Sequence, residues 1–183
     1  MEPTPFIQGE KIDLLPLNIS NVEIYVKWVN RPKIRKFGRS VIPKTVEQWK
    51  KLIHAEEKGI KDSVSLEIWH KSDQKPIGEL GLFNINWFDK KAYIGLSIGE
   101  IDYWNQGICT EALKLITNYA FAELNLNKLY SYIFAPNKAS CRCVEKNGFI
   151  REAILKKDVF IDGKYEDTYF YSIFKEDWMK LNG

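Results

Sequence analysis

The fold is decided by residues 99–112, Gly99-Glu100-Ile101-Asp102-Tyr103-Trp104-Asn105-Gln106-Gly107-Ile108-Cys109-Thr110-Glu111-Ala112. This stretch places a turn that contains Gly107 between an apolar strand and a helix whose apolar residues recur at helical spacing. The first backbone N–H groups of such a helix have no partner within it and lie at the positive end of its dipole, so they suit a phosphate or pyrophosphate. The stretch lacks the ending of a Walker loop and the further glycines of a dinucleotide fingerprint.

On either side of this stretch, the periodicity of apolar residues predicts a mixed α/β fold in one domain that spans residues 1–183. The expected strands are 11–17, 64–68, 77–85, 92–98, 129–134, 154–160 and 168–174, and the expected helices are 22–29, 46–55, 110–124 and 137–146. Residues 33–44 are expected to form a loop, because Arg31-Pro32 closes the first helix. This order describes a central mixed sheet of about seven strands flanked by about four helices.

Composition excludes several classes of function. The chain has 183 residues, with 27 Lys and Arg against 24 Asp and Glu, and a net charge of +3 is too small for a protein built mainly to bind a nucleic-acid backbone. No apolar run is long enough to cross a membrane, and the N-terminus lacks a secretion signal. We therefore expect a cytoplasmic protein that binds neither nucleic acid nor membrane.

The three cysteines, Cys109, Cys141 and Cys143, fit neither a disulfide framework nor paired zinc ligands. Cys141 and Cys143 point to different faces of a predicted helix, so we expect neither a metal site nor a disulfide from that pair. A reducing compartment is the simpler interpretation.

A second motif follows about thirty residues after the first: Asn137-Lys138-Ala139-Ser140-Cys141-Arg142-Cys143-Val144-Glu145-Lys146-Asn147-Gly148-Phe149. Together the two motifs resemble the GNAT superfamily of acyl-CoA-dependent N-acetyltransferases, in particular the branch that acetylates the N-terminal alanine of ribosomal proteins. The resemblance covers about residues 9–178. It implies a GNAT fold, with a twisted central sheet splayed at the fourth strand, and acetyl-CoA as co-substrate with no metal.

The resemblance also implies which residues hold the cofactor. Those expected to do so are Ile98, Gly99, Asn105, Gln106, Gly107, Ile108, Cys109, Thr110 and Asn137. The family normally has glycine or alanine where this chain has Cys109, a departure that is expected to tighten the approach of the pyrophosphate. A backbone N–H of the Ile98–Gly99 region would hold the oxyanion.

The catalytic residues follow from the chemistry of amine acetylation. An alkyl ammonium, with a pKa of about 10, must lose a proton before it can attack a thioester. Glu100 and Glu79 are the carboxylates nearest the expected cleft, and Glu100 is slightly favoured as the base, against the alternative that either is a surface charge. Many superfamily members protonate the departing thiolate with a tyrosine, but this chain has Val144 there, so Ser140 is the candidate donor, unless it only braces the helix start.

The acceptor stays open between two classes of amine. The branch resemblance implies the N-terminal amine of a protein, and the alternative is a small amine such as a polyamine or an aminoglycoside. A different kind of function, a non-catalytic sensor that binds acyl-CoA, is a further alternative. A homodimer is compatible with any of these functions. Several aromatic residues are candidates for lining an acceptor groove, with Trp87-Phe88 as its exposed lip: Trp28, Phe37, Trp49, Phe83, Trp87, Phe88 and Tyr93.

Overall fold

The computed structural model describes residues 4–38, 41–55 and 61–182. The strands are β1 (Ile7–Gln8), β2 (Ile12–Pro16), β3 (Val64–His70), β4 (Lys75–Asn86), β5 (Lys91–Ile98), β6 (Lys128–Phe134), β7 (Ile150–Ile161) and β8 (Lys164–Phe174). The α-helices are α1 (Val22–Asn30), α2 (Pro32–Gly38), α3 (Val46–Ala55), α4 (Ile108–Ala122), α5 (Lys138–Lys146) and α6 (Lys175–Asn182), and two short 3₁₀ turns, η1 (Ile19–Asn21) and η2 (Ile101–Tyr103), precede α1 and α4. The predicted mixed α/β class is confirmed.

The strands form one mixed sheet in the order β1-β2-β3-β4-β5-β6-β8-β7. All neighbours are antiparallel except β5 and β6, which are parallel and joined through α4. That parallel pairing covers only residues 91–93 of β5 against residues 128–130 of β6, so the two strands separate beyond Tyr93. This separation is the splay expected at the fourth of the predicted strands.

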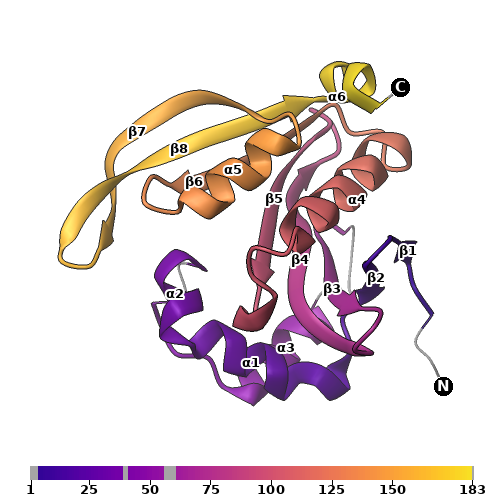
Figure 1. The fold of residues 1–183 in the computed structure, drawn as a ribbon, viewed down its shortest axis with the longest axis vertical. Coiled ribbons are helices and arrows are strands. Elements are labelled where there is room, and N and C mark those ends of the chain that lie inside the picture. Colours follow the sequence, from indigo (N-terminus) through magenta and orange to yellow (C-terminus); the bar gives the residue numbers. More distant parts are fainter. Residues whose placement is uncertain (1–3, 39–40, 56–60, 183) are drawn as a thin grey trace.

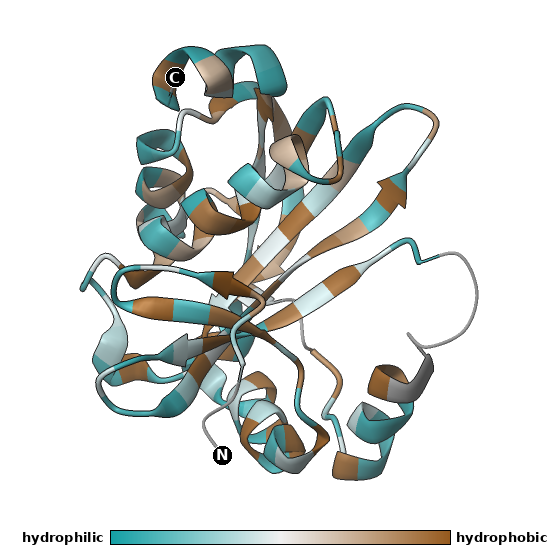
Figure 2. Cartoon of the chain, turned by 90° about the vertical axis from the view of Figure 1, so that its right-hand side faces the viewer, coloured by the Kyte–Doolittle hydropathy of each residue, from teal (hydrophilic) through white to brown (hydrophobic). Residues whose placement is uncertain are grey.

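The main core lies between the sheet and helices α4 and α5. Alternate residues of β2 to β5, such as Leu14, Ile68 and Leu82, pack against Ile116 and other apolar residues of α4. Figure 2 shows this period-two alternation as brown and teal blocks along the strands. Helices α1 to α3 gather at one end of the molecule, while α4 and α5 lie beside each other (Figure 1). No helix in the described part of the chain is long and apolar enough to cross a membrane.

The structure corrects the predicted element count. Residues 32–38 form α2 rather than the start of a loop, because proline at the first position of a helix loses no intrahelical bond and is already fixed at a helical φ. The Pro32 signal thus marks a new helix after a one-residue break at Arg31. Helix α6 and the two-residue strand β1 were also not expected.

Candidate active site

The splay exposes one backbone edge of β5. Gly99 donates its N–H to the Ile77 carbonyl of β4 at 2.9 Å, whereas the Ile98 carbonyl accepts a bond from Trp104 Nε1 at 2.9 Å. Backbone groups of an antiparallel strand point alternately to its two sides, so the N–H of Ile98 faces the splay and that of Gly99 does not. Of the two residues expected to supply the oxyanion donor, Ile98 therefore has the suitable direction.

Helix α4 begins beside this edge. Gly107, its N-terminal flanking residue, has φ +84°, and a Cβ there would meet no atom within 4 Å, so the backbone conformation rather than crowding requires glycine. The first intrahelical bond runs from Glu111 N–H to the Gly107 carbonyl at 3.0 Å. The N–H groups of residues 108–110 thus precede the first helical bond and point out of the helix start. Nearby, Gln106 is held by a 2.6 Å bond from Nε2 to the Asp102 carbonyl.

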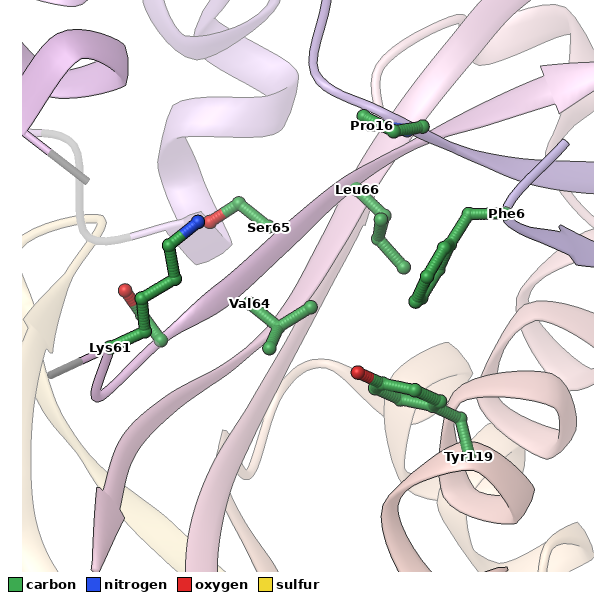
Figure 3. A pocket seen from close by; sticks show the side chains of 8 residues that line it. Phe6, Pro16, Lys61, Val64, Ser65, Leu66 and Tyr119 are labelled. Carbon is green, nitrogen blue, oxygen red and sulfur yellow. The ribbon is translucent and has the colours of Figure 1, made fainter. Parts of the chain in front are cut away.

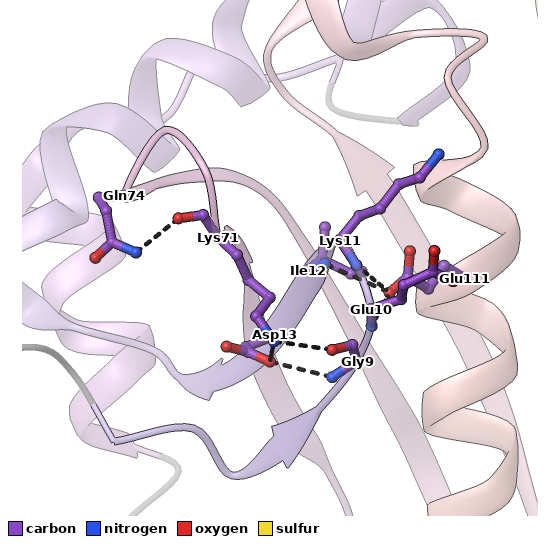
Figure 4. Close-up of polar contacts among 8 residues, drawn as sticks. All are labelled: Gly9, Glu10, Lys11, Ile12, Asp13, Lys71, Gln74 and Glu111. Atoms are coloured by element: carbon purple, nitrogen blue, oxygen red, sulfur yellow. Dashed lines mark hydrogen bonds and ion pairs between the residues drawn. The ribbon is translucent and has the colours of Figure 1, made fainter.

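Glu111 anchors this helix start to the N-terminal strands. Its Oε1 accepts the backbone N–H groups of Glu10, Lys11 and Ile12 at 2.7, 2.9 and 3.4 Å, as Figure 4 shows. A Cβ on Gly9 would lie 2.7 Å from the same oxygen. The glutamate of the threonine-glutamate-alanine motif is therefore a clamp between α4 and the turn before β2.

The cysteines correct an expectation. Cys109, in the first turn of α4, forms a disulfide with Cys143 of α5, with the two Cα atoms 6.5 Å apart, and Cys141 is free and buried. The expectation that the three cysteines form no disulfide was wrong, and the only pair weighed individually was Cys141 with Cys143. The actual partners are 34 residues apart and meet because α4 and α5 pack together.

Glu100 is held in a network of polar contacts. Trp28 Nε1 donates to its Oε1 at 2.6 Å, and Arg31 Nη1 lies 3.4 Å from its Oε2 and 3.0 Å from the Gly99 carbonyl. Burial alone would raise the pKa of Glu100, but the bond from Trp28 and the charge of Arg31 outweigh it and hold the pKa below its ordinary value. The Trp28 ring lies directly on Gly99, where a Cβ would come within 2.1 Å of a ring carbon.

Glu79 lies on β4 in a different environment. Its cross-strand partners are Glu67 on β3 and Ser97 on β5. Burial raises the pKa of Glu79 to about 7. Glu67 itself is 1% exposed and accepts bonds from the Tyr25 hydroxyl and, at 2.9 Å, from Asn21 Nδ2. Glu79 is therefore the carboxylate of the predicted pair whose protonation changes near neutral pH.

The second motif forms the start of α5. Asn137 caps the helix, since its Oδ1 accepts the Ser140 N–H at 3.2 Å. Ser140 is half-buried, and Val144, which replaces the tyrosine common in the superfamily, is 7% exposed. Asn137 Oδ1 thus caps α5, while the role of Asn137 in holding the cofactor and that of the Ser140 hydroxyl as a proton donor stay predictions.

These features fit acetyl-CoA. The donors of residues 108–110 and the unobstructed Gly107 suit a pyrophosphate, and the open edge of β5 at Ile98 suits the amides of a pantetheine arm. Two interactions were missed from the sequence, namely the clamp of Trp28 and Arg31 on Glu100 and the bond from Trp104 to Ile98. No local pattern signals the first, because its members are about seventy residues apart.

Two shallow pockets lie away from these residues. One, of about 270 Å³, is lined by apolar residues such as Phe6, Leu66 and Tyr119 (Figure 3). The other, of about 260 Å³, lies between α5 and β8 and is lined in part by Lys138 and Arg151. Neither pocket is lined by Glu79 or Glu100. The expected lip residues are indeed exposed, Trp87 by 37% and Phe88 by 95%.

A splayed sheet with a phosphate-suited helix start, and a carboxylate on the neighbouring strand, is the arrangement of a group-transfer enzyme that uses a CoA thioester. The model of the Acetyltransferase (GNAT) domain matches residues 11–150, and the chain belongs to this family. It is an acetyl-CoA-dependent N-acetyltransferase.

Relatives and solved structures agree with this assignment. "Probable N-acetyltransferase YjcK" of Bacillus subtilis (strain 168) is 32% identical over 93% of this chain and 98% of its own length. YdaF of the same organism, whose name proposes ribosomal N-acetylation, is 27% identical over 90% of this chain and 86% of its own. Spermidine N(1)-acetyltransferase of Escherichia coli (strain K12) is 29% identical over 67% and 66%. The spermidine N-acetyltransferase of Vibrio cholerae, solved in complex with CoA and spermine, has the same fold, with a TM-score of 0.86 over 93% of this chain and 99% of its own, at 19% identity.

Proposed function

We propose that this enzyme acetylates the primary amine of a small, positively charged aliphatic molecule, with Glu79 as the general base. The observation that carries the proposal is a partly buried carboxylate with a pKa of about 7, on the strand next to the open edge of β5. A base that titrates near neutral pH combines availability with the strength to accept a proton from an ammonium group.

Three groups of the chain have different proposed roles in the reaction. Acetyl-CoA, when bound, supplies an activated acetyl thioester. The Glu79 carboxylate takes one proton from the acceptor nitrogen, directly or through a water molecule. The N–H of Ile98 donates to the acyl oxygen as negative charge develops there, and it needs little reorganisation because it belongs to a strand. The nitrogen forms a bond to the acyl carbon as the C–S bond breaks. The Ser140 hydroxyl is the candidate donor of a proton to the departing sulfur, and it replaces this proton with the second proton lost by the nitrogen.

Glu100 takes a positioning role in this proposal. With its pKa lowered by Trp28 and Arg31, its carboxylate stays ionised and bound to them, so it is a weaker proton acceptor than Glu79. Its contacts instead fix α1 against the end of β5. This replaces the slight preference for Glu100 as base with a preference for Glu79.

For the acceptor, a small cationic amine is favoured over a protein N-terminus. The spermidine acetyltransferases of Escherichia coli and Vibrio cholerae act on such amines, and the first is similar to this chain in sequence. Within the described residues, two carboxylates, Glu67 and Glu79, lie side by side on the sheet face that the acceptor would approach. YdaF supports the alternative, a ribosomal N-terminus.

The test is release of CoA thiol from acetyl-CoA with spermidine, butylamine and an alanine-starting peptide. We expect turnover of spermidine and a loss of about 100-fold or more in kcat for Glu79→Gln, with a smaller loss for Glu100→Gln. Glu10→Gln, an exposed carboxylate in the turn before β2, is the matched control. Turnover of the peptide alone would contradict the assignment of a small amine as the acceptor. Full activity of Glu79→Gln would contradict the assignment of Glu79 as the general base.

A further inference from the structure

A row of aromatic side chains crosses four neighbouring strands of the sheet. Ring centroids are 6.1 Å apart for Phe83 and Tyr93, 6.3 Å for Tyr93 and Tyr132, and 5.2 Å for Tyr132 and Phe170. Cross-strand registers, such as Phe83 with Tyr93 and Tyr132 with Phe170, place these rings on one face. We call the following residues the aromatic row: Phe83, Tyr93, Tyr130, Tyr132 and Phe170.

The aromatic row shares its face with the proposed base. Between residues 78 and 83 of β4 the pairing with β5 is regular, so Glu79, Gly81 and Phe83 point to the same side. Four residues of strand separate Glu79 from Phe83, a distance of about 13 Å. The row therefore begins within reach of a molecule whose amine lies at Glu79.

A pair of glycines forms the floor between them. Gly81 and Gly95 face each other across β4 and β5, and the Phe83 ring leans over both. A Cβ on Gly81 would lie 2.8 Å from Phe83 Cζ, and one on Gly95 would lie 3.2 Å from Phe83 Cε2. The absence of both side chains lets the ring extend the aromatic surface toward Glu79.

The row keeps part of its surface open, and a cation already lies on its far end. Tyr132 is 41% exposed, and the other four rings are partly exposed. Lys128 Nζ lies 5.5 Å from the Phe170 centroid and 4.8 Å from that of Phe174, and 2.9 Å from a Glu152 oxygen. Ring faces attract an ammonium group, and the apolar surface of the rings also packs against methylene groups.

We propose that the aromatic row binds the distal ammonium and the methylene chain of an extended aliphatic diamine or polyamine whose reacting amine lies at Glu79. The inference rests on the proposed function and adds to it the residues that determine specificity. Phe83 and Tyr93 are the members nearest the base, and they act on acceptor binding rather than on proton transfer.

Matched acceptors test this role. CoA thiol release is measured with 1,8-diaminooctane and with octylamine, which has the same chain but no distal charge. For Phe83→Leu and Tyr93→Leu we expect KM for the diamine to rise roughly 5- to 30-fold with kcat nearly unchanged, and KM for octylamine to change much less. Phe83→Tyr, which keeps an aromatic ring, should have a KM for the diamine close to that of wild type, unlike Phe83→Leu. Phe160→Leu, at a ring 64% exposed on β7, is the matched control.

Several results would overturn the inference. Equal rises in KM for the diamine and for octylamine would show that the aromatic row only packs against the alkyl chain. A fall in kcat without a change in KM would show that the aromatic row does not bind the acceptor. A change in molecular mass in solution for the exposed Tyr132→Leu variant would make the row an interface between copies of the chain. Turnover of an alanine-starting peptide with neither amine would instead contradict the proposed function itself.

Discussion

Replacing Glu79 with glutamine should make the protein more stable at alkaline pH while it removes the proposed base. Burial raises the pKa of Glu79 from 4.5 to about 7. A rise of roughly 2.5 pKa units corresponds to a cost of about 3 kcal/mol for keeping this carboxylate ionised in the folded state. Glutamine has the same shape and no charge, so Glu79→Gln avoids that cost.

The pH dependence fixes the sign. Below the unfolded pKa of 4.5 both states bind the proton, and Glu79 costs nothing. As the pH rises from 4.5 to 7, the unfolded state loses its proton first, so the folded wild type loses stability relative to Glu79→Gln. Above about pH 7 the difference stays constant at about 3 kcal/mol, and at pH 5 it is less than about 1 kcal/mol.

Urea unfolding at pH 5 and pH 8 measures this difference. At pH 8 the midpoint of Glu79→Gln should lie about 1–3 M urea above that of wild type, given m-values of about 1–3 kcal/mol/M. Glu10→Gln, an exposed site, should show no such pH-dependent gain. An equal gain at both pH values, or a loss of stability at pH 8, would refute the assignment of a raised pKa to Glu79.

Four further outcomes follow from the same structure. The value of kcat/KM should rise about tenfold between pH 6 and pH 8, because a Glu79 carboxylate with a pKa of about 7 loses its proton over this range. A flat profile of kcat/KM against pH would exclude Glu79 as the base. Glu111→Ala removes an acceptor of three backbone N–H groups and should cost about 2–4 kcal/mol in urea unfolding, and a cost below about 0.5 kcal/mol would exclude the clamp. Gly99→Ala forces the Trp28 ring away and should cost about 1–3 kcal/mol and shift the tryptophan fluorescence, whereas an unchanged spectrum would contradict the contact. Thiol titration of unfolded, unreduced protein should find one reactive cysteine, Cys141, and three would contradict the disulfide.

The parts of the fold that follow from local periodicity could be predicted from the sequence. The period-two pattern over residues 77–85 and 92–98 and the helical pattern after Gly107 identify β4, β5 and α4, and their order implies the crossover that creates the splay. Helix α2 was missed because proline stops one helix and starts another with the same local signal.

Candidate residues for the site could be proposed from the sequence, but their electrostatics could not be predicted. Sequence placed both Glu79 and Glu100 near the cleft, yet their pKa values move in opposite directions. The difference comes from Trp28 and Arg31, which lie about seventy residues before Glu100 and meet it only in three dimensions. The disulfide between Cys109 and Cys143 was missed for the same reason, since spacing carries no information on how α4 and α5 pack.

The opposite pKa shifts of Glu79 and Glu100 are consistent with the different roles proposed for the two carboxylates. Glu100 is a weak base because the Trp28 indole and the Arg31 guanidinium stabilise its ionised carboxylate. The same contacts hold α1 on the end of β5. Glu79 has no hydrogen bond among the causes of its shift, and burial alone raises its pKa. A carboxylate can accept a proton near neutral pH only if its charged form is not strongly stabilised by such contacts. Glu79, whose burial lowers the stability of the folded state, is therefore the carboxylate that we propose takes the proton of the amine.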